Sequence, residues 1–140
     1  MNAPSTVRHQ DGSAAIEFAI IAPLLFMLIF GMLQYGLAFF QVQNLRAAVR
    51  EGARVAAVRG APADVKAAIA AASTGSLSGT SSDWAYSQSP ATCSDATSGS
   101  PITVTLTALP TAVVDTFSIN VPFLPPFVLT PTISGSFRCE

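Results

Sequence analysis

A continuous apolar stretch dominates the first third of the chain. Within residues 18–40 the only strongly polar residue is Gln34, and a helix of that length would cross the roughly 30 Å hydrocarbon core of a bilayer. The helical pattern then continues through "QVQNLRAAVREGARVAAVRG", until the sequence "GAP" at residues 60–62 ends it. We therefore predict one long helix over residues 13–60, of which about residues 18–40 span a membrane.

Beyond that helix, the pattern predicts a small domain at residues 61–140. A short helix is expected at "ADVKAAIAAAS", followed by a connector rich in Ser and Gly at residues 73–100. Strict alternation predicts a strand at "ITVTLTAL". We expect a second strand at "VVDTFSINV", an edge, turn or extended segment at the proline-rich "FLPPFVLTP", and a last strand at "TISGSFRC". The predicted fold class is α+β, with the long N-terminal helix packed on a small antiparallel β-sheet.

Composition and charge exclude several classes of function. Charged residues make up 11% of the chain, against about 25% in an average soluble domain, and the net charge of -1 creates no field that would recruit nucleic acid. The single histidine, His9, precedes the apolar stretch. No catalytic set, metal-ligand spacing or phosphate-binding glycine loop is present in the sequence. We therefore predict a protein that is not an enzyme and that needs no cofactor or metal.

The two cysteines and the arginines give opposite indications about orientation. Cys93 and Cys139 would form a disulfide in an oxidising compartment, worth about 4 kcal/mol in the chain-entropy model, and this favours an exported domain. Most of the arginines near the apolar stretch follow it, which predicts a cytoplasmic C-terminus. Charge alone leaves the orientation open.

One carboxylate, Glu17, lies near the start of the apolar stretch. The helix dipole alone favours an acidic residue in the first turn by about 0.3–1 kcal/mol. If the chain were cut after Gly12, Ser13 would gain an α-amine with a pKa of about 7.7–8.0, and Glu17 would lie four residues along the same helical face. A carboxylate paired with the amine of a neighbouring chain would then neutralise both charges and set the axial register of stacked helices.

These residues resemble the start of a prepilin, in which Gly12 is followed by Glu17 and Phe18, and Pro23 lies six residues after the glutamate. The segment "GSAAIEFAIIAPLL", followed by "GMLQYG" and "AAVREGARVAA", is similar to the TadE-like family of tight-adherence (Tad) pilus pseudopilins. The terminal "SGSFRCE" is similar to the ending of that family, but Cys139 stands where an aromatic or small residue is expected.

The resemblance implies a leader at residues 1–12, which an inner-membrane prepilin peptidase removes between Gly12 and Ser13. It also implies a lollipop shape like that of type IV pilins and a single-pass protein of the bacterial inner membrane with its C-terminal domain outward, which overrides the arginine count. The protein would be a minor pseudopilin that acts with other pilins and the Tad assembly machinery in pilus assembly and surface adhesion.

Two rows of residues mark the second half of the predicted helix. Arg46, Arg50 and Arg54 form a basic stripe, which either binds anionic lipid headgroups, at about 1 kcal/mol each, or pairs with acidic residues of neighbouring subunits. A row of small residues allows close helix packing, and we expect the chain's own sheet to pack there in preference to a neighbouring helix. The row consists of Ala48, Gly52 and Ala56.

Two alternatives stay open from the sequence. The chain could be a signal-anchored envelope protein that keeps its N-terminus and acts as an interaction module. It could also be a small secreted β protein cut after Ala38, since Gly36 and Ala38 satisfy the small-residue rule for a signal peptidase.

Overall fold

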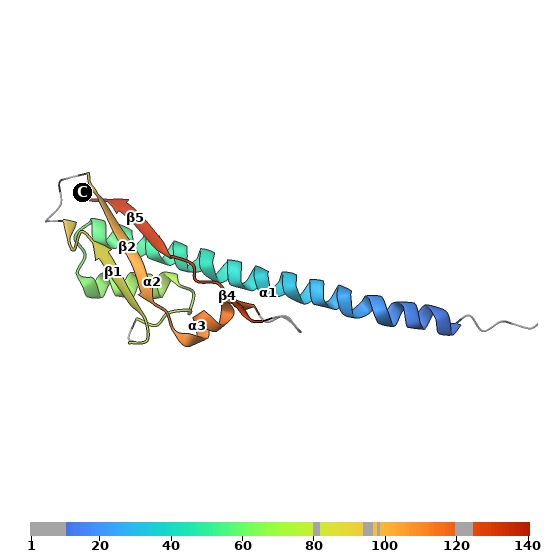
Figure 1. The fold of residues 1–140 in the computed structure, drawn as a ribbon. Helices are drawn as coiled ribbons and strands as arrows, with labels where there is room; N and C mark the ends of the chain where they lie inside the picture. The colour runs from blue at the N-terminus through green and yellow to red at the C-terminus, as the bar shows by residue number, and fades with distance from the viewer. Residues whose placement is uncertain (1–10, 80–81, 94–96, 98, 120–124) are drawn as a thin grey trace, which may run out of the picture.

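A computed structural model describes residues 11–79, 82–93, 97, 99–119 and 125–140. One helix, α1 (Asp11–Ala57), runs the length of the molecule. Its first half extends away from the other elements, and its second half packs along a small domain (Figure 1). This confirms the predicted α+β class, a long apolar helix on a small antiparallel sheet. Most of the predicted leader lies outside the described residues.

A tight turn reverses the chain after α1 and starts α2 (Pro62–Ala72). Arg59 adopts a left-handed backbone conformation with φ of 63°, and the N–H of Gly60 donates to the carbonyl of Val55 at 3.0 Å. The carboxylate of Asp64 accepts a hydrogen bond from the N–H of Ala61, one of the donors that a helix start leaves unpaired. The returning helix α2 packs against α1.

The main sheet has three antiparallel strands in the order β1-β2-β5. These are β1 (Ala85–Ser89), β2 (Pro101–Ala108) and β5 (Ser134–Arg138). In β2 the buried Ile102 and Val104 alternate with the half-buried Thr103 and Thr105, as the sequence pattern predicts. Strands β2 and β5 contact α1, so the core lies between the sheet and the two helices.

The connector predicted at residues 73–100 supplies one strand, β1, which pairs with β2. Trp84, just before β1, is buried, and its indole N–H donates to the carbonyl of Ser78 at 2.6 Å. The ammonium group of Lys66 on α2 lies 5.0 Å from the centre of the Trp84 ring. An aromatic side chain therefore holds this part of the connector against the rest of the domain.

The strand predicted at "VVDTFSINV" is wrong for its first part. The structure has a short helix there, α3 (Thr111–Thr116), followed by a strand, β3 (Ser118–Ile119), and the last two residues of the predicted strand, 120 and 121, lie outside the described residues. Val113 and Phe117 are both buried and are four residues apart, which is a helical spacing. Strand β3 pairs with β4 (Phe127–Val128), which comes from the proline-rich segment that we expected to be an edge, turn or extended segment.

Candidate functional site

The first half of α1 is an apolar surface that the chain itself does not cover. Among the described residues, α1 is the helix long and apolar enough to cross a membrane, with a mean hydropathy of 2.4 and none of its most apolar window buried. Large apolar side chains lie exposed on all its sides, and a soluble monomer rarely exposes so large a contiguous apolar surface to water. The segment is compatible with a membrane anchor. The exposed side chains are Ile16, Phe18, Ile20, Ile21, Leu24, Leu25, Phe26, Leu28, Ile29, Phe30, Met32, Leu33, Tyr35, Leu37, Phe39 and Phe40.

The predicted processing and assembly residues lie in the first turns of α1, far from the folded domain (Figure 1). The hydroxyl of Ser13 donates to the carboxylate of Glu17 over a long 3.5 Å, so the helix does bring these two residues together on one face. Both side chains are exposed, as is that of Phe18. Pro23 lies inside the helix, where it removes one backbone hydrogen bond.

The predicted basic stripe is not uniform along its length. Arg50 and Arg54 are exposed, whereas Arg46 is half-buried. Arg54 forms an ion pair with Glu51 at 3.3 Å, one turn away on the same helix. This pair was not predicted from the sequence. An exposed pair of this kind contributes about 0–1 kcal/mol, and it reduces the positive charge that the stripe presents.

The row of small residues is buried inside the molecule, but α2 occupies a position where we expected the sheet. A methyl group added at Gly52 would lie 2.4 Å from Cγ1 of Ile69 on α2, so Gly52 lets the two helices approach. The sheet reaches α1 elsewhere. A methyl group added at Gly135 of β5 would lie 2.9 Å from the backbone nitrogen of Arg50. A glycine inside a predicted strand is a recognised sign of close backbone approach, and the sequence interpretation made no use of it.

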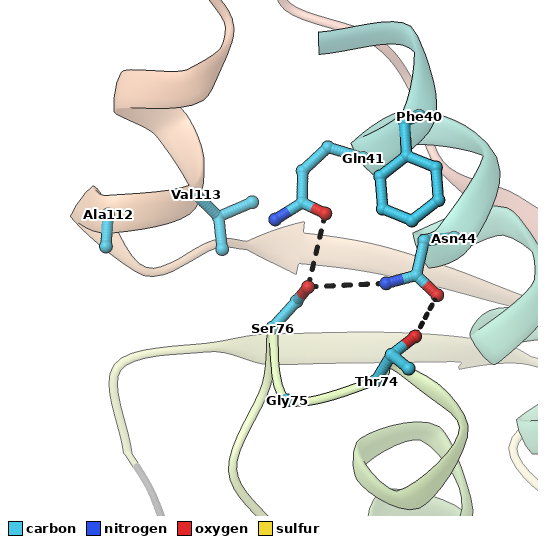
Figure 2. Close-up of a pocket in the computed structure, with 8 residues that line it drawn as sticks. All are labelled: Phe40, Gln41, Asn44, Thr74, Gly75, Ser76, Ala112 and Val113. Carbon is cyan, nitrogen blue, oxygen red and sulfur yellow. Dashed lines mark hydrogen bonds between the residues drawn. The ribbon is translucent and has the colours of Figure 1, made fainter. Parts of the chain in front are cut away.

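A group of neutral polar side chains, here called the polar clamp, joins α1 to the turn after α2 (Figure 2). It consists of Gln41, Asn44, Thr74 and Ser76. The amide of Asn44 donates to the hydroxyl of Ser76 at 3.3 Å and to the carbonyl of Ser73 at 2.7 Å, and it accepts from Thr74 at 2.6 Å. The hydroxyl of Ser76 donates to Gln41 at 3.3 Å. These residues line a pocket of about 480 Å³.

The polar clamp has no group suited to acid, base or nucleophilic chemistry at neutral pH, and its geometry is that of a structural joint. Sequence reasoning missed it because amide and hydroxyl side chains so far apart in the chain give no pattern before the fold is known. Among the described residues, no three His, Cys, Asp or Glu side chains gather where they could hold a metal ion.

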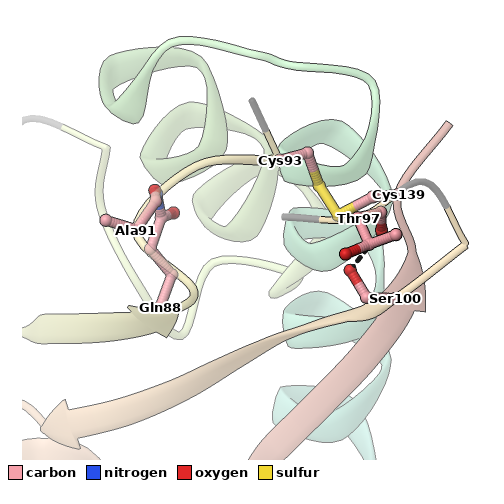
Figure 3. Close-up of a disulfide and its surroundings, with 6 residues drawn as sticks. All are labelled: Gln88, Ala91, Cys93, Thr97, Ser100 and Cys139. Carbon is pink, nitrogen blue, oxygen red and sulfur yellow. Dashed lines mark hydrogen bonds between the residues drawn. A yellow bond between two sulfur atoms is a disulfide. The ribbon is translucent and has the colours of Figure 1, made fainter. Parts of the chain in front are cut away.

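Cys93 and Cys139 form a disulfide at the end of the domain farthest from the first half of α1 (Figures 1 and 3). Their Cα atoms are 5.5 Å apart and both residues are buried. The N–H of Cys139 donates to the carbonyl of Ser100 at 2.9 Å, which continues the pairing of β2 with β5 by one residue. The cysteine that departs from the expected family ending is therefore the one that ties the C-terminus to the connector.

The comparison with known families agrees with the motifs in α1. The family described as TadE-like protein matches residues 12–54, which lie entirely within α1. No curated protein and no solved structure matches the chain. The matched range contains the glycine, glutamate and proline of the N-terminal motif, the apolar segment and the basic stripe. The predicted resemblance is confirmed over residues 12–54, which match the TadE-like family, and this match is consistent with a protein of a Tad pilus.

Proposed function

We propose that the chain is a minor pilin-like subunit, a pseudopilin, of a Tad pilus. Before assembly it is held in the inner membrane by the first half of α1, with the domain facing outward. The observation that carries the proposal is that the apolar half of α1, within the TadE-like match, is left uncovered by the chain's own domain. Lipid covers this surface in the membrane, and neighbouring helices cover it in a filament.

The outward orientation has its own support in the disulfide. A bond between Cys93 and Cys139 persists in an oxidising compartment, such as the periplasm or cell surface, and is rare in the cytosol. The excess of arginines after the span indicates the opposite orientation.

Maturation would give Glu17 its role. A prepilin peptidase cuts between Gly12 and Ser13, and the new α-amine then lies one turn before the carboxylate. Because Glu17 is exposed and far from the domain, it is accessible to the amine of a neighbouring subunit as well as to its own. Pairing across subunits neutralises both charges in an apolar environment, where an unpaired charge is costly, and so sets the axial register.

The first test is the intact mass of the protein purified from its own membranes. We expect a chain that begins at Ser13. An uncut chain would contradict the proposal and favour a signal-anchored envelope protein that acts as an interaction module. A chain that begins at Phe39 would indicate a signal peptide. Such a cut would fall inside α1, beside Ala38, which is buried against the domain.

The second test is Glu17→Ala, with Glu51→Ala as the matched control on the same helix. We expect the E17A protein to be cleaved and inserted but absent from pili, with surface adhesion reduced. The E51A protein loses only an exposed ion pair and should assemble normally. Normal incorporation of E17A would show that Glu17 does not set the register.

A further inference from the structure

The domain carries a second apolar surface, here called the apolar tip, which consists of Val114 on α3 and Phe127 and Val128 on β4. We propose that the apolar tip inserts into the outer interface of the same bilayer that α1 crosses, so that each subunit contacts the membrane at two places. This inference rests on the membrane topology of the proposed function. It adds the lipid bilayer as a partner of the folded domain itself.

The apolar tip lies at the correct level along α1. The residues that follow β4, from Leu129 to Pro131, line a cleft of about 300 Å³ together with Tyr35, Ala38 and Phe39 of α1. Those α1 residues form the last turns of the predicted membrane span. Ala38 is fully buried. Figure 1 shows β4 on the side of the domain that faces the first half of α1, opposite the disulfide end.

The three residues of the apolar tip are exposed, and the segment that contains β4 carries no charged residue. Phe127 is 63% exposed, Val128 48% and Val114 37%. The sequence contains no Asp, Glu, Lys, Arg or His between Asp115 and Arg138. In the same segment, Pro125 and Pro126 are exposed next to β4. Exposed apolar residues that lie together are a feature of surfaces that bind a membrane or a protein.

Charges near the apolar tip are placed as a bilayer interface requires. Arg46 lines the same cleft between α1 and the segment after β4, where its guanidinium can reach lipid phosphates while its stem lies on apolar surface. Tyr35, stacked on Phe39 at 6.4 Å, supplies the kind of amphipathic ring that is enriched at this depth. The exposed Asp115 at the end of α3 limits the depth of insertion and keeps α3 at the level of the headgroups.

The occupant that these observations favour is lipid, because the segment directly after β4 lines a cleft with the last turns of the predicted membrane span, which lipid must already cover. A second copy of the chain is the competing occupant, and the experiment separates the two. The full-length protein is placed in vesicles whose lipids carry bromine either at shallow or at deep positions on the acyl chains, and iodide is supplied on both sides. Bromine quenches tryptophan inside the bilayer, and iodide quenches tryptophan in water.

Three variants report on three places: Phe127→Trp on the apolar tip, Phe30→Trp in the membrane span, and Phe137→Trp on β5. Phe137 is the matched control, since it is 44% exposed but lies on the strand that leads to the disulfide end. The native Trp84 is buried and gives a constant background in every variant. We expect bromine to reduce the emission of F127W and F30W, and iodide to reduce that of F137W alone.

The proposal is overturned if iodide quenches F127W as it does F137W while F30W responds to bromine. It is also overturned if neither agent quenches F127W, because the apolar tip would then be covered by protein. If F30W itself is insensitive to bromine, then α1 does not span the bilayer, and the proposed function fails together with this inference. The response of F30W therefore distinguishes the two failures.

Discussion

At the scale of single residues, two glycines determine how closely the domain approaches α1. At Gly135 an added methyl group would meet backbone atoms of α1, at 2.9 Å from the nitrogen of Arg50 and 3.0 Å from its Cα atom. Backbone atoms cannot rotate away as a side chain can. At Gly52 the methyl group would meet the buried side chain of Ile69, which has some freedom to move.

We predict that Gly135→Ala lowers the free energy of unfolding by about 1–3 kcal/mol, the usual cost of overpacking a core. Gly52→Ala should also destabilise, but by less, because alanine recovers up to about 1 kcal/mol of helix propensity. Gly36→Ala is the control on the same helix, since nothing lies within 4 Å of its added methyl group. The free energy of unfolding of all three variants is measured by denaturant titration in detergent, with near-UV circular dichroism as the signal. Equal stability of G135A and G36A would refute the close approach.

A tyrosine joins β1 to the start of α2 and gives the domain a pH dependence. The hydroxyl of Tyr86 donates to the carbonyl of Pro62 at 2.8 Å, and burial raises the pKa of Tyr86 above its usual value of 10.0. The folded state thus holds this proton more tightly than the unfolded chain. The corresponding stability is complete below pH 10.0 and is lost as the pH rises through the folded pKa.

We predict that Tyr86→Phe costs about 0.5–1.5 kcal/mol at neutral pH, the net value of one hydrogen bond. The difference between wild type and Y86F should shrink as the pH rises above 10.0, because only the wild type loses this contribution. Unfolding by urea at neutral and alkaline pH measures the difference. A difference that stays constant with pH would contradict a raised pKa.

At the scale of elements, the polar clamp determines where α2 lies along α1. Asn44 alone provides three of its hydrogen bonds, to Ser73, Thr74 and Ser76. It lies just beyond the predicted membrane span, so in the proposed topology it would hold the domain at a constant height above the bilayer. Ser73, which is fully buried, completes the turn by donating from its hydroxyl to the carbonyl of Ala70 at 2.7 Å.

We predict that Asn44→Ala destabilises the domain by about 1–3 kcal/mol, because it leaves partners of a part-buried amide unpaired. Amide hydrogen exchange should show the loss of protection first in the turn after α2. Gln43→Ala is the control, since Gln43 precedes Asn44 on the same helix and its side chain is exposed. Unchanged protection at residues 73–77 in N44A would show that the apolar contacts of α2 alone hold the turn.

The elements that the sequence predicted well are the long or strongly periodic ones. The apolar pattern is sufficient to predict α1, and alternation is sufficient to predict β2. Helix α3 was missed because it has only six residues and most of them are β-branched, which lowers helix propensity. Its helical spacing is visible only from the burial of Val113 and Phe117 in the folded domain. The N-terminal motif was read from local spacing, whereas the clamp and the contact of Gly135 depend on partners far away in the chain.

At the scale of the whole molecule, the structure has two parts. They are the apolar first half of α1, here called the rod, and a small domain that contains one disulfide. Figure 1 shows the C-terminus at the end of the molecule opposite the apolar half of α1, and the disulfide of Cys93 and Cys139 is one residue before that terminus. Because the domain is small, its core supplies limited stability and the disulfide matters correspondingly more. The rod and the domain should therefore respond differently to reduction.

We predict that the double variant Cys93→Ser, Cys139→Ser loses about 4 kcal/mol of stability, the value expected from chain entropy for a loop of this length. Thermal unfolding followed by near-UV circular dichroism should show a lower midpoint for the domain. Far-UV signal from the lipid-embedded half of α1 should persist above that midpoint. An unchanged midpoint under reducing conditions would show that packing alone holds the C-terminus.

The same bond determines how the domain would carry a pulling force. Strand β5 lies at the edge of the sheet and pairs only with β2, so a pull on its free end would separate the hydrogen-bonded residue pairs one after another. Cys139 follows β5 directly, and its sulfur transfers the load to Cys93 and from there to the chain leading back to β1. Tension at the C-terminus is then shared between β5 and the chain that leads back to β1, so that it does not act on the pairing of β5 with β2 alone.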